Sequence, residues 1–232
     1  MTDRSLAGLS TRDAALASGA AWLAFMTGLV AGGDVEDAGS LAIAAAIATV
    51  VVVVGFAAAW RCRSLPARSN ARRVRLGLWS LGLGVLLGLA NLGANWLIAA
   101  VNPTLRELLV ERMAGLAPLT GVVAAPLVEE VTVRLFLMSA MAWLVSLATG
   151  RASIAFVVAL AGSSFVFALL HLARPVPGDP GLADFYRAAL IVKYTLAGLP
   201  LGWAFWHWGL PYAILCHVAA NAAHLAIQSR LF

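Results

Sequence analysis

Two adjacent glutamates, Glu129 and Glu130, lie in a stretch of the sequence that is otherwise strongly apolar. Arg134 follows Glu130 by four residues, so on a helix the two side chains share a face in the order that favours an ion pair. Glu129 lies about 100° further around the same helix and lacks this counter-ion. The sequence therefore predicts that Glu130 has a structural role in an ion pair and that Glu129 is available for chemistry. The alternative is that both glutamates serve helix packing or assembly.

Two later apolar stretches each carry a histidine at a spacing that suits catalysis. Phe167 and His171 are four residues apart, and so are His217 and Asn221. An imidazole and an amide on one helix face can direct their donors at one developing negative charge. A carboxylate that is stripped of water becomes a stronger base, which suits Glu129 to general-base chemistry.

The other two histidines are expected to be structural. His224 lies seven residues after His217, and we expect it near the edge of the membrane. His207 lies between Trp206 and Trp208, and such an aromatic cluster is typical of a membrane interface.

The composition excludes a water-soluble globular domain. The chain has 232 residues, of which 62% are hydrophobic and 12% are charged, and its mean hydropathy is +0.89. A soluble domain carries about 25% charged residues. Two cysteines give neither a disulfide framework nor a metal-binding spacing. We therefore predict an all-α, polytopic transmembrane helix bundle that forms one integrated membrane domain.

The number of membrane spans follows from the lengths of the apolar stretches. About 20 such residues cross a bilayer as a helix. Five stretches have this length, namely 14–32, 39–60, 76–101, 119–148 and 152–173. Two more are shorter or interrupted, namely 184–207 and 210–229. The interruption in 184–207 comes from Arg187 and Lys193. We predict about seven spans, with six or eight as alternatives.

The chain divides into two parts by content. Residues 1–118 contain the first spans and an amphipathic helix over 104–116, which we expect to lie at the membrane interface. Residues 119–232 contain the catalytic transmembrane core. In the third span small residues and asparagines recur on one face, which predicts a helix-packing surface made of Gly77, Gly84, Gly88, Asn91 and Asn95.

The charges between spans predict the orientation. Six arginines lie between the second and third spans, and three acids lie in the loop before them, at Asp34, Glu36 and Asp37. Arginine-rich short loops stay in the cytoplasm, so we expect a cytoplasmic amino terminus. The same rule explains these arginines without a nucleic-acid partner. Fifteen arginines against one lysine are typical of a GC-rich bacterial genome, so we expect a bacterial inner membrane.

Three motifs follow one another inside the predicted spans. Residues 129–134 fit EExxxR, residues 167–171 fit FxxxH, and residues 217–221 fit HxxxN. In this order they resemble the CAAX-protease and bacteriocin-processing family, which contains the Ras-converting prenyl endopeptidases. The glycine-rich, aromatic run 198–209 is similar to the segment that precedes the last motif in that family. The resemblance covers residues 119–225.

The resemblance implies an intramembrane endopeptidase that acts on a membrane-associated protein or peptide. It implies that Glu129 is the general base that activates water with help from His171. It further implies that His217 and Asn221 stabilise the oxyanion at the scissile carbonyl. Glu130, Arg134 and Phe167 then have supporting roles. No cofactor is implied, and the oligomeric state is left open.

Three alternatives remain from the sequence. One carboxylate with two histidines is a catalytic zinc set, although the HExxH spacing is absent. A bacteriocin-immunity protein or scaffold could keep the fold without the activity. A proton-coupled transporter also uses buried acids and histidines, but this chain is short and shows no repeat symmetry.

Overall fold

The computed structural model describes residues 38–62, 70–114, 120–172 and 180–231. Within these ranges the chain is helical apart from short connections, and it contains no strand. This confirms the all-α prediction. The first predicted span, 14–32, lies outside the described residues.

Five helices are long and apolar enough to cross a membrane. Four of them are single elements, and the fifth is a composite rod over Gly121–Thr149. The four are α3 (Asn70–Val101), α7 (Ala152–Leu170), α8 (Pro180–Trp208) and α9 (Leu210–Leu231). Together with the composite rod, these four helices confirm the last five predicted spans. The second predicted span is the helix α2 (Ala38–Cys62), and its apolar stretch within the described residues is Ala45–Ala59.

The composite rod changes its helical winding around the two glutamates. It comprises the π-helix η1 (Thr120–Ala124), α5 (Ala125–Glu129), the π-helix η2 (Glu130–Met138) and α6 (Ser139–Thr149). Pro126 has no N–H and cannot continue the regular ladder of hydrogen bonds. π-helical turns are rare and occur frequently at functional sites. Glu129 and Glu130 lie where α5 passes into η2.

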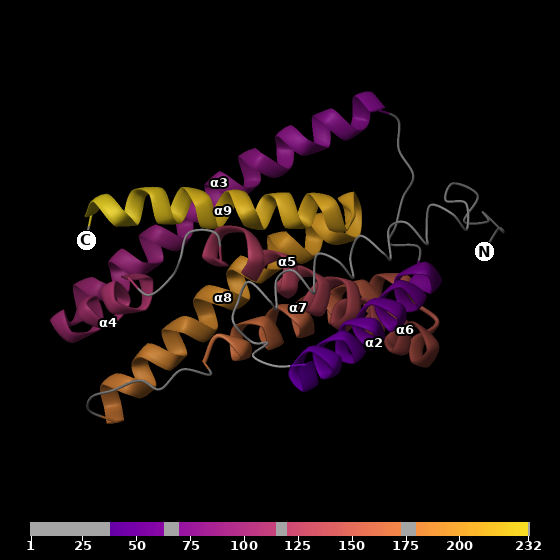
Figure 1. Cartoon of the computed structure of the whole chain (residues 1–232), viewed down its shortest axis with the longest axis horizontal. Helices are drawn as coiled ribbons and strands as arrows, with labels where there is room; N and C mark the ends of the chain where they lie inside the picture. The colour runs from indigo at the N-terminus through magenta and orange to yellow at the C-terminus, as the bar shows by residue number, and fades with distance from the viewer. Residues whose placement is uncertain (1–37, 63–69, 115–119, 173–179, 232) are drawn as a thin grey trace.

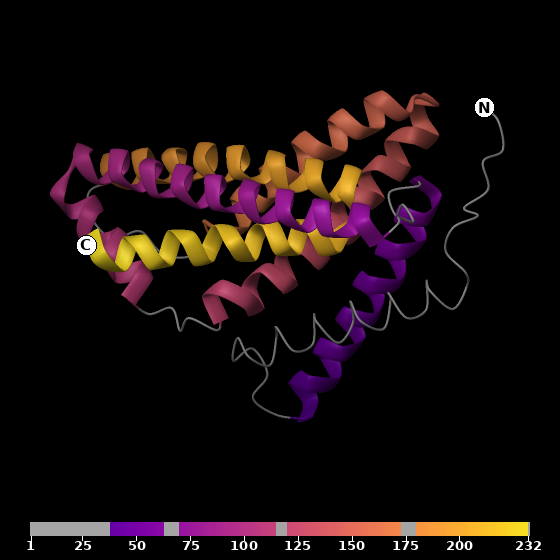
Figure 2. The same ribbon diagram turned by 90° about the horizontal axis from the view of Figure 1, so that it is seen from above.

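Helices α3 and α9 pack along each other over much of their length (Figures 1 and 2). A Cβ atom at Gly84 would collide with the carbonyl oxygen of Cys216, and one at Gly88 with that of Ala220. Only glycine permits this approach, as in other membrane helix pairs that meet at small residues. The predicted packing face of the third span is therefore confirmed.

The composite rod packs against α2, α7 and α9. Helix α7 packs between α6 and α8, and α2 crosses η2 and α6 from outside (Figure 2). The short helix α4 (Pro103–Ala114) buries Leu105 and Leu109 and exposes Arg106 and Glu107. A helix is thus present where the sequence predicted one, whereas its position at the membrane interface stays a prediction.

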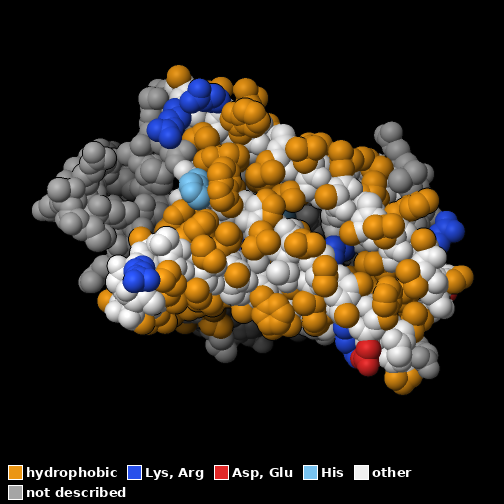
Figure 3. Space-filling view, turned by 180° about the vertical axis from the view of Figure 1, so that it is seen from behind, with side chains coloured by type: hydrophobic (Ala, Val, Ile, Leu, Met, Phe, Trp, Pro, Cys, Tyr) orange, Lys and Arg blue, Asp and Glu red, His pale blue; other side chains and the backbone are white. Residues whose placement is uncertain are grey.

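The outer surface is that of a membrane protein. Figure 3 shows hydrophobic side chains over most of one face, with few charged ones. Large apolar side chains such as Trp79 and Leu97 are 63% and 69% exposed. A soluble monomer rarely exposes apolar patches on this scale, so these surfaces are expected to face lipid.

Candidate active site

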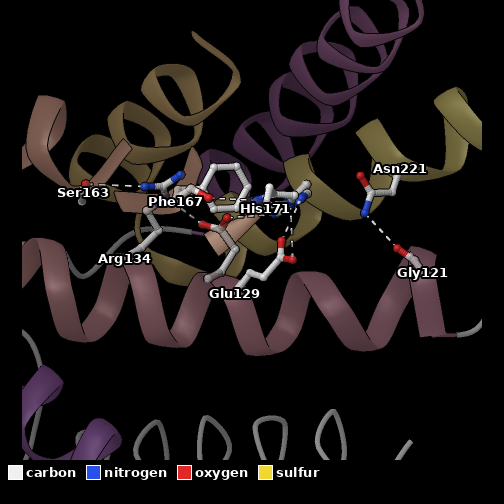
Figure 4. A network of polar contacts seen from close by, with 9 residues as sticks. Gly121, Glu129, Arg134, Ser163, Phe167, His171 and Asn221 are labelled. Atoms are coloured by element: carbon white, nitrogen blue, oxygen red, sulfur yellow. Dashed lines mark hydrogen bonds and ion pairs between the residues drawn. The ribbon is translucent and has the colours of Figure 1, made fainter. Parts of the chain in front are cut away.

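Glu130 and Arg134 form a completely buried pair at the centre of the bundle. Arg134 Nε lies 3.5 Å from Glu130 Oε2, and solvent reaches neither side chain. Arg134 Nη1 donates to Ser163 Oγ at 3.5 Å, and the guanidinium lies 5.2 Å from the centre of the Phe167 ring. The predicted pairing is confirmed. Glu130 and Arg134 thus neutralise each other, and Arg134 connects the composite rod to α7 (Figure 4).

His217 lies between the two glutamates. Its Nδ1 atom is 2.9 Å from Glu130 Oε1, and its Nε2 atom is 3.5 Å from Glu129 Oε2. An ionised carboxylate can only accept, so Nδ1 donates to Glu130. The second ring nitrogen then faces Glu129. Glu130 thus has two partners, Arg134 and His217, whereas the sequence predicted only the first.

Glu129 is the accessible member of the glutamate pair. Its side chain is 27% exposed, and its Oε1 atom lies 3.9 Å from His171 Nε2. The other ring nitrogen of His171 lies 2.8 Å from the Phe167 carbonyl oxygen, which can only accept. A neutral His171 therefore turns the lone pair of Nε2 toward Glu129. Helix spacing predicted no counter-ion for Glu129, but the fold places two imidazoles beside it.

Aromatic rings fix both histidines in place. Phe167 is 2% exposed and meets the ring of His171 edge-on at 4.6 Å and that of His217 at 5.9 Å. Tyr194 stacks on His171 with ring centres 3.8 Å apart. Sequence reasoning missed Tyr194 because its partner lies on another helix, and only the neighbouring charge of Lys193 marked this part of α8.

Asn221 lies one helical turn from His217 but has a different partner. Its Nδ2 atom donates to the carbonyl oxygen of Gly121 at 2.8 Å, and Figure 4 shows it directed toward η1 rather than toward Glu129. The amide NH₂ has two hydrogens, so this bond uses one of them. Asn221 thereby fastens α9 to the start of the composite rod.

All four predicted catalytic residues line one cavity. The cavity has a volume of about 380 Å³, and Glu129, His171, His217 and Asn221 all contribute to its wall. Most of the remaining wall is apolar. A volume of this size falls within the range of small-ligand sites, about 300–1,000 Å³.

A second polar cluster lines the same cavity. Lys193 Nζ donates to Asn95 Oδ1 at 2.7 Å, and Asn95 Nδ2 lies 3.4 Å from a ring nitrogen of His224. The side chain of His224 is only 6% exposed, so it faces the interior of the bundle, and its expected position near the membrane edge stays a prediction. The close approach of α3 at Gly88 brings the asparagine within reach.

The same residues offer the ligand types of a catalytic zinc site. Glu129, His171 and His217 are one acid and two imidazoles. Among the residues that the structure describes, however, no group of three or more histidine, cysteine or acidic side chains is arranged to hold a metal ion.

Residues 111–223 match the family model described as type II CAAX prenyl endopeptidase Rce1-like. This match confirms the family resemblance that the three motifs predicted. The match includes the four predicted catalytic residues, Glu129, His171, His217 and Asn221. No curated protein matches the chain, and no solved structure does. Together with the five apolar helices, this match supports an integral membrane protein of the CAAX-protease type.

Proposed function

We propose that this Rce1-like chain hydrolyses a peptide bond within the membrane with a water molecule that Glu129 activates. The observation that carries the proposal is the position of Glu129. It is a partly exposed carboxylate in the cavity wall, and the Nε2 atoms of His171 and His217 lie 3.9 Å and 3.5 Å from its oxygens.

The attacking water would lie between Glu129 and His171. Their 3.9 Å separation exceeds a good direct hydrogen bond of about 2.7–3.2 Å. Both atoms can accept, so each can take one hydrogen of a shared water and leave its oxygen lone pair free. Attack on the carbonyl carbon transfers the water proton to Glu129. Glu129 then returns the proton to the leaving amine as the carbon–nitrogen bond breaks.

His217 and Asn221 would stabilise the oxyanion that this attack creates. Between the two carboxylates His217 would be the doubly protonated imidazolium, so that Nδ1–H donates to Glu130 while Nε2–H is presented to the cavity as a second donor. Asn221 keeps one amide hydrogen on Gly121 and has a second one for the substrate. Donors held in advance by such bonds need no rearrangement during the reaction, which is the source of their effect on rate.

Glu130 and Arg134 support this arrangement without taking part in it. Both are fully buried, so no substrate atom can reach them. Their role is to orient His217 and to join the composite rod to α7 through Ser163. A charged pair retained at this depth is costly in a membrane, which favours a specific task for it.

The substrate would be a membrane protein or a membrane-associated peptide. We expect the enzyme in a bacterial inner membrane with its amino terminus in the cytoplasm, from the arginine distribution alone. A comparison of protein termini in cells that carry the wild type or Glu129→Gln tests the proposal. New termini in membrane proteins should require the wild type.

The matched control for that comparison is Glu107→Gln, which removes an exposed glutamate on α4. It should produce the same termini as the wild type. If cells with the wild type and cells with Glu129→Gln show identical protein termini, Glu129 is not the general base. If cells with Glu129→Gln keep the wild-type phenotype, the result favours an immunity or scaffold role.

A further inference from the structure

Exposed arginines from two places in the sequence gather at one end of the bundle. Arg72, Arg73 and Arg75 lie in the first turns of α3, and Arg151 lies between α6 and α7. All four side chains are exposed, and the proposed hydrolysis uses none of them. We call the surface that these four arginines form the basic end.

The packing of α3 on α9 shows which helix ends meet there. Gly84 of α3 lies against Cys216 of α9, and Gly88 lies against Ala220, so the two helices run in the same direction. The start of α3 therefore lies at the same end of the bundle as the start of α9. Helix α9 follows the end of α8 almost directly, so the end of α8 lies there too.

The start of α7 lies at this end as well. The ring of Phe156, near the start of α7, lies 5.2 Å from the ring of Trp206 and 5.5 Å from that of His207, at the end of α8. Arg151 precedes Phe156 by five residues, which is about 7.5 Å along a helix. Figure 3 shows basic side chains at two places on one end of the molecule and a histidine between them.

The helices that meet at the basic end give it a positive charge. Helices α3, α6, α7 and α9 contain no acidic residue, and the single acid of α8, Asp184, lies near the opposite end of that helix. Charges of both signs occur at the opposite end of the bundle. There Arg187 pairs with Asp184 at 3.0 Å, and Glu107 follows Arg106 on α4.

Apolar side chains that are expected to face lipid begin beside each group of arginines. On α3 these are Val74, Leu78 and Trp79, which are all largely exposed. On α7 the exposed Val157 follows Arg151 by six residues. Each group of cations therefore lies at the head of an apolar strip. A phospholipid has the matching order, with a charged headgroup above its acyl chains.

An aromatic cluster marks the depth of the headgroups at the same end. Trp203 stacks on His207 with ring centres 4.6 Å apart and meets Trp208 edge-on at 5.0 Å. Trp203 and His207 are exposed. Tryptophan is enriched where the hydrocarbon of a membrane meets the headgroups. The arginines of the basic end thus lie where lipid phosphates would be.

We propose that the basic end binds the phosphate groups of anionic phospholipids. Arginine donates strong, charge-assisted hydrogen bonds to phosphate, and basic residues beside a membrane span are attracted to anionic lipids. A phospholipid matches both the arginines and the apolar strips, whereas a soluble anion or an acidic protein segment would match the arginines alone. Bound lipid fixes the depth of the bundle in the leaflet that we expect to be cytoplasmic. This inference does not depend on the proposed hydrolysis.

Native mass spectrometry of the full-length protein, released from a nonionic detergent, tests the preference for anionic lipid. In separate titrations, dioleoylphosphatidylglycerol should bind about tenfold more tightly than dioleoylphosphatidylcholine. This preference should fall as the ionic strength rises, because salt screens exposed charges. Equal affinities for the two lipids would overturn the proposal.

Matched variants test the position of the lipid. Arg75→Gln/Arg151→Gln removes one cation from each group and should lower the preference for phosphatidylglycerol by about threefold or more. Arg106→Gln/Arg187→Gln removes two exposed cations from the opposite end and should keep the wild-type preference. Equal losses in these two variants, or no loss in the first, would contradict the basic end as the binding surface.

A conservative variant shows whether charge is what the lipid requires. Arg75→Lys/Arg151→Lys keeps both positive charges and should bind phosphatidylglycerol as the wild type does. A loss as large as that of the glutamine variant would contradict an ionic contact with phosphate.

Two soluble anions test whether the ligand is a lipid. Inorganic phosphate has the charged group without the acyl chains, and hexaglutamate represents an acidic protein segment. Neither should displace phosphatidylglycerol when added at the concentration of the lipid. Displacement by phosphate would indicate a site for a free anion, and displacement by hexaglutamate would indicate an acidic protein partner. Either result would overturn the assignment to lipid.

Discussion

The Nδ1 atom of His217 donates to Oε1 of Glu130 over 2.9 Å, at a depth that solvent does not reach. This contact joins α9 to the composite rod and selects the ring nitrogen that faces the cavity. Glu130 also holds Arg134, so one buried carboxylate anchors an imidazole and a guanidinium. The position of His217 in the cavity wall therefore depends on Glu130, which is fully buried and out of reach of a substrate.

The buried pair predicts a specific pattern of stabilities. Arg134→Met leaves Glu130 without its cation and should lower the free energy of unfolding by about 3–5 kcal/mol. The double variant Glu130→Gln/Arg134→Met should lose less than Arg134→Met alone, because no charge remains unpaired. Thermal unfolding in detergent measures both.

The control for this series is Arg151→Met, at an exposed site between α6 and α7. It should change stability by less than about 0.5 kcal/mol. Equal losses from the single and the double variant would show that Glu130 does not depend on Arg134.

Phe167 is predicted to act on rate through the histidines. Phe167→Leu fills most of the same buried volume, so stability should fall by less than about 1.5 kcal/mol. Loss of the ring edge against His171 and His217 should lower kcat by about 10–100-fold with little change in KM. Phe165→Leu, on the exposed face of the same helix, should leave both constants unchanged. An unchanged kcat in Phe167→Leu would show that the ring only fills space.

Helix periodicity made part of the site predictable. Four-residue spacing places Glu130 beside Arg134, and the structure confirms that pair. The same rule kept His217 and Asn221 on one face, and both line the cavity. Spacing also identified the small-residue face of α3, because a helix that must approach another closely requires glycine there.

Contacts between helices could not be predicted in this way. The stacking of Tyr194 on His171 depends on how α8 is rotated against α7. The burial of His224 depends on the height at which α3 crosses α9. A single sequence contains the period of each helix but neither of these relations. The sequence also did not predict the π-helical turns around Glu130, because only the backbone conformation within the bundle distinguishes them from α-helix.

Asn221 is predicted to matter more for rate than for stability. Asn221→Ala removes the proposed oxyanion donor and should lower kcat by about 10²–10³-fold. It also removes the bond to Gly121, which should cost about 1 kcal/mol of stability. Turnover and unfolding measured on the same preparation separate the two effects. If kcat falls only in proportion to the folded fraction, the role of Asn221 is purely structural.

Chelation distinguishes the two hydrolytic mechanisms. Incubation of purified enzyme with 1,10-phenanthroline, followed by its removal, should leave turnover unchanged if Glu129 alone activates water. A loss of activity that added Zn²⁺ restores would favour the zinc alternative. Metal analysis of the same preparation checks that the chelator reached the cavity.

The most direct test of the account is the turnover of purified Glu129→Gln on a peptide that the wild type cleaves. The amide keeps the size of the side chain but cannot accept the water proton, so kcat should fall by at least 10³-fold while thermal unfolding stays close to that of the wild type. A rate within tenfold of the wild type, in protein that is equally well folded, would contradict the role of Glu129.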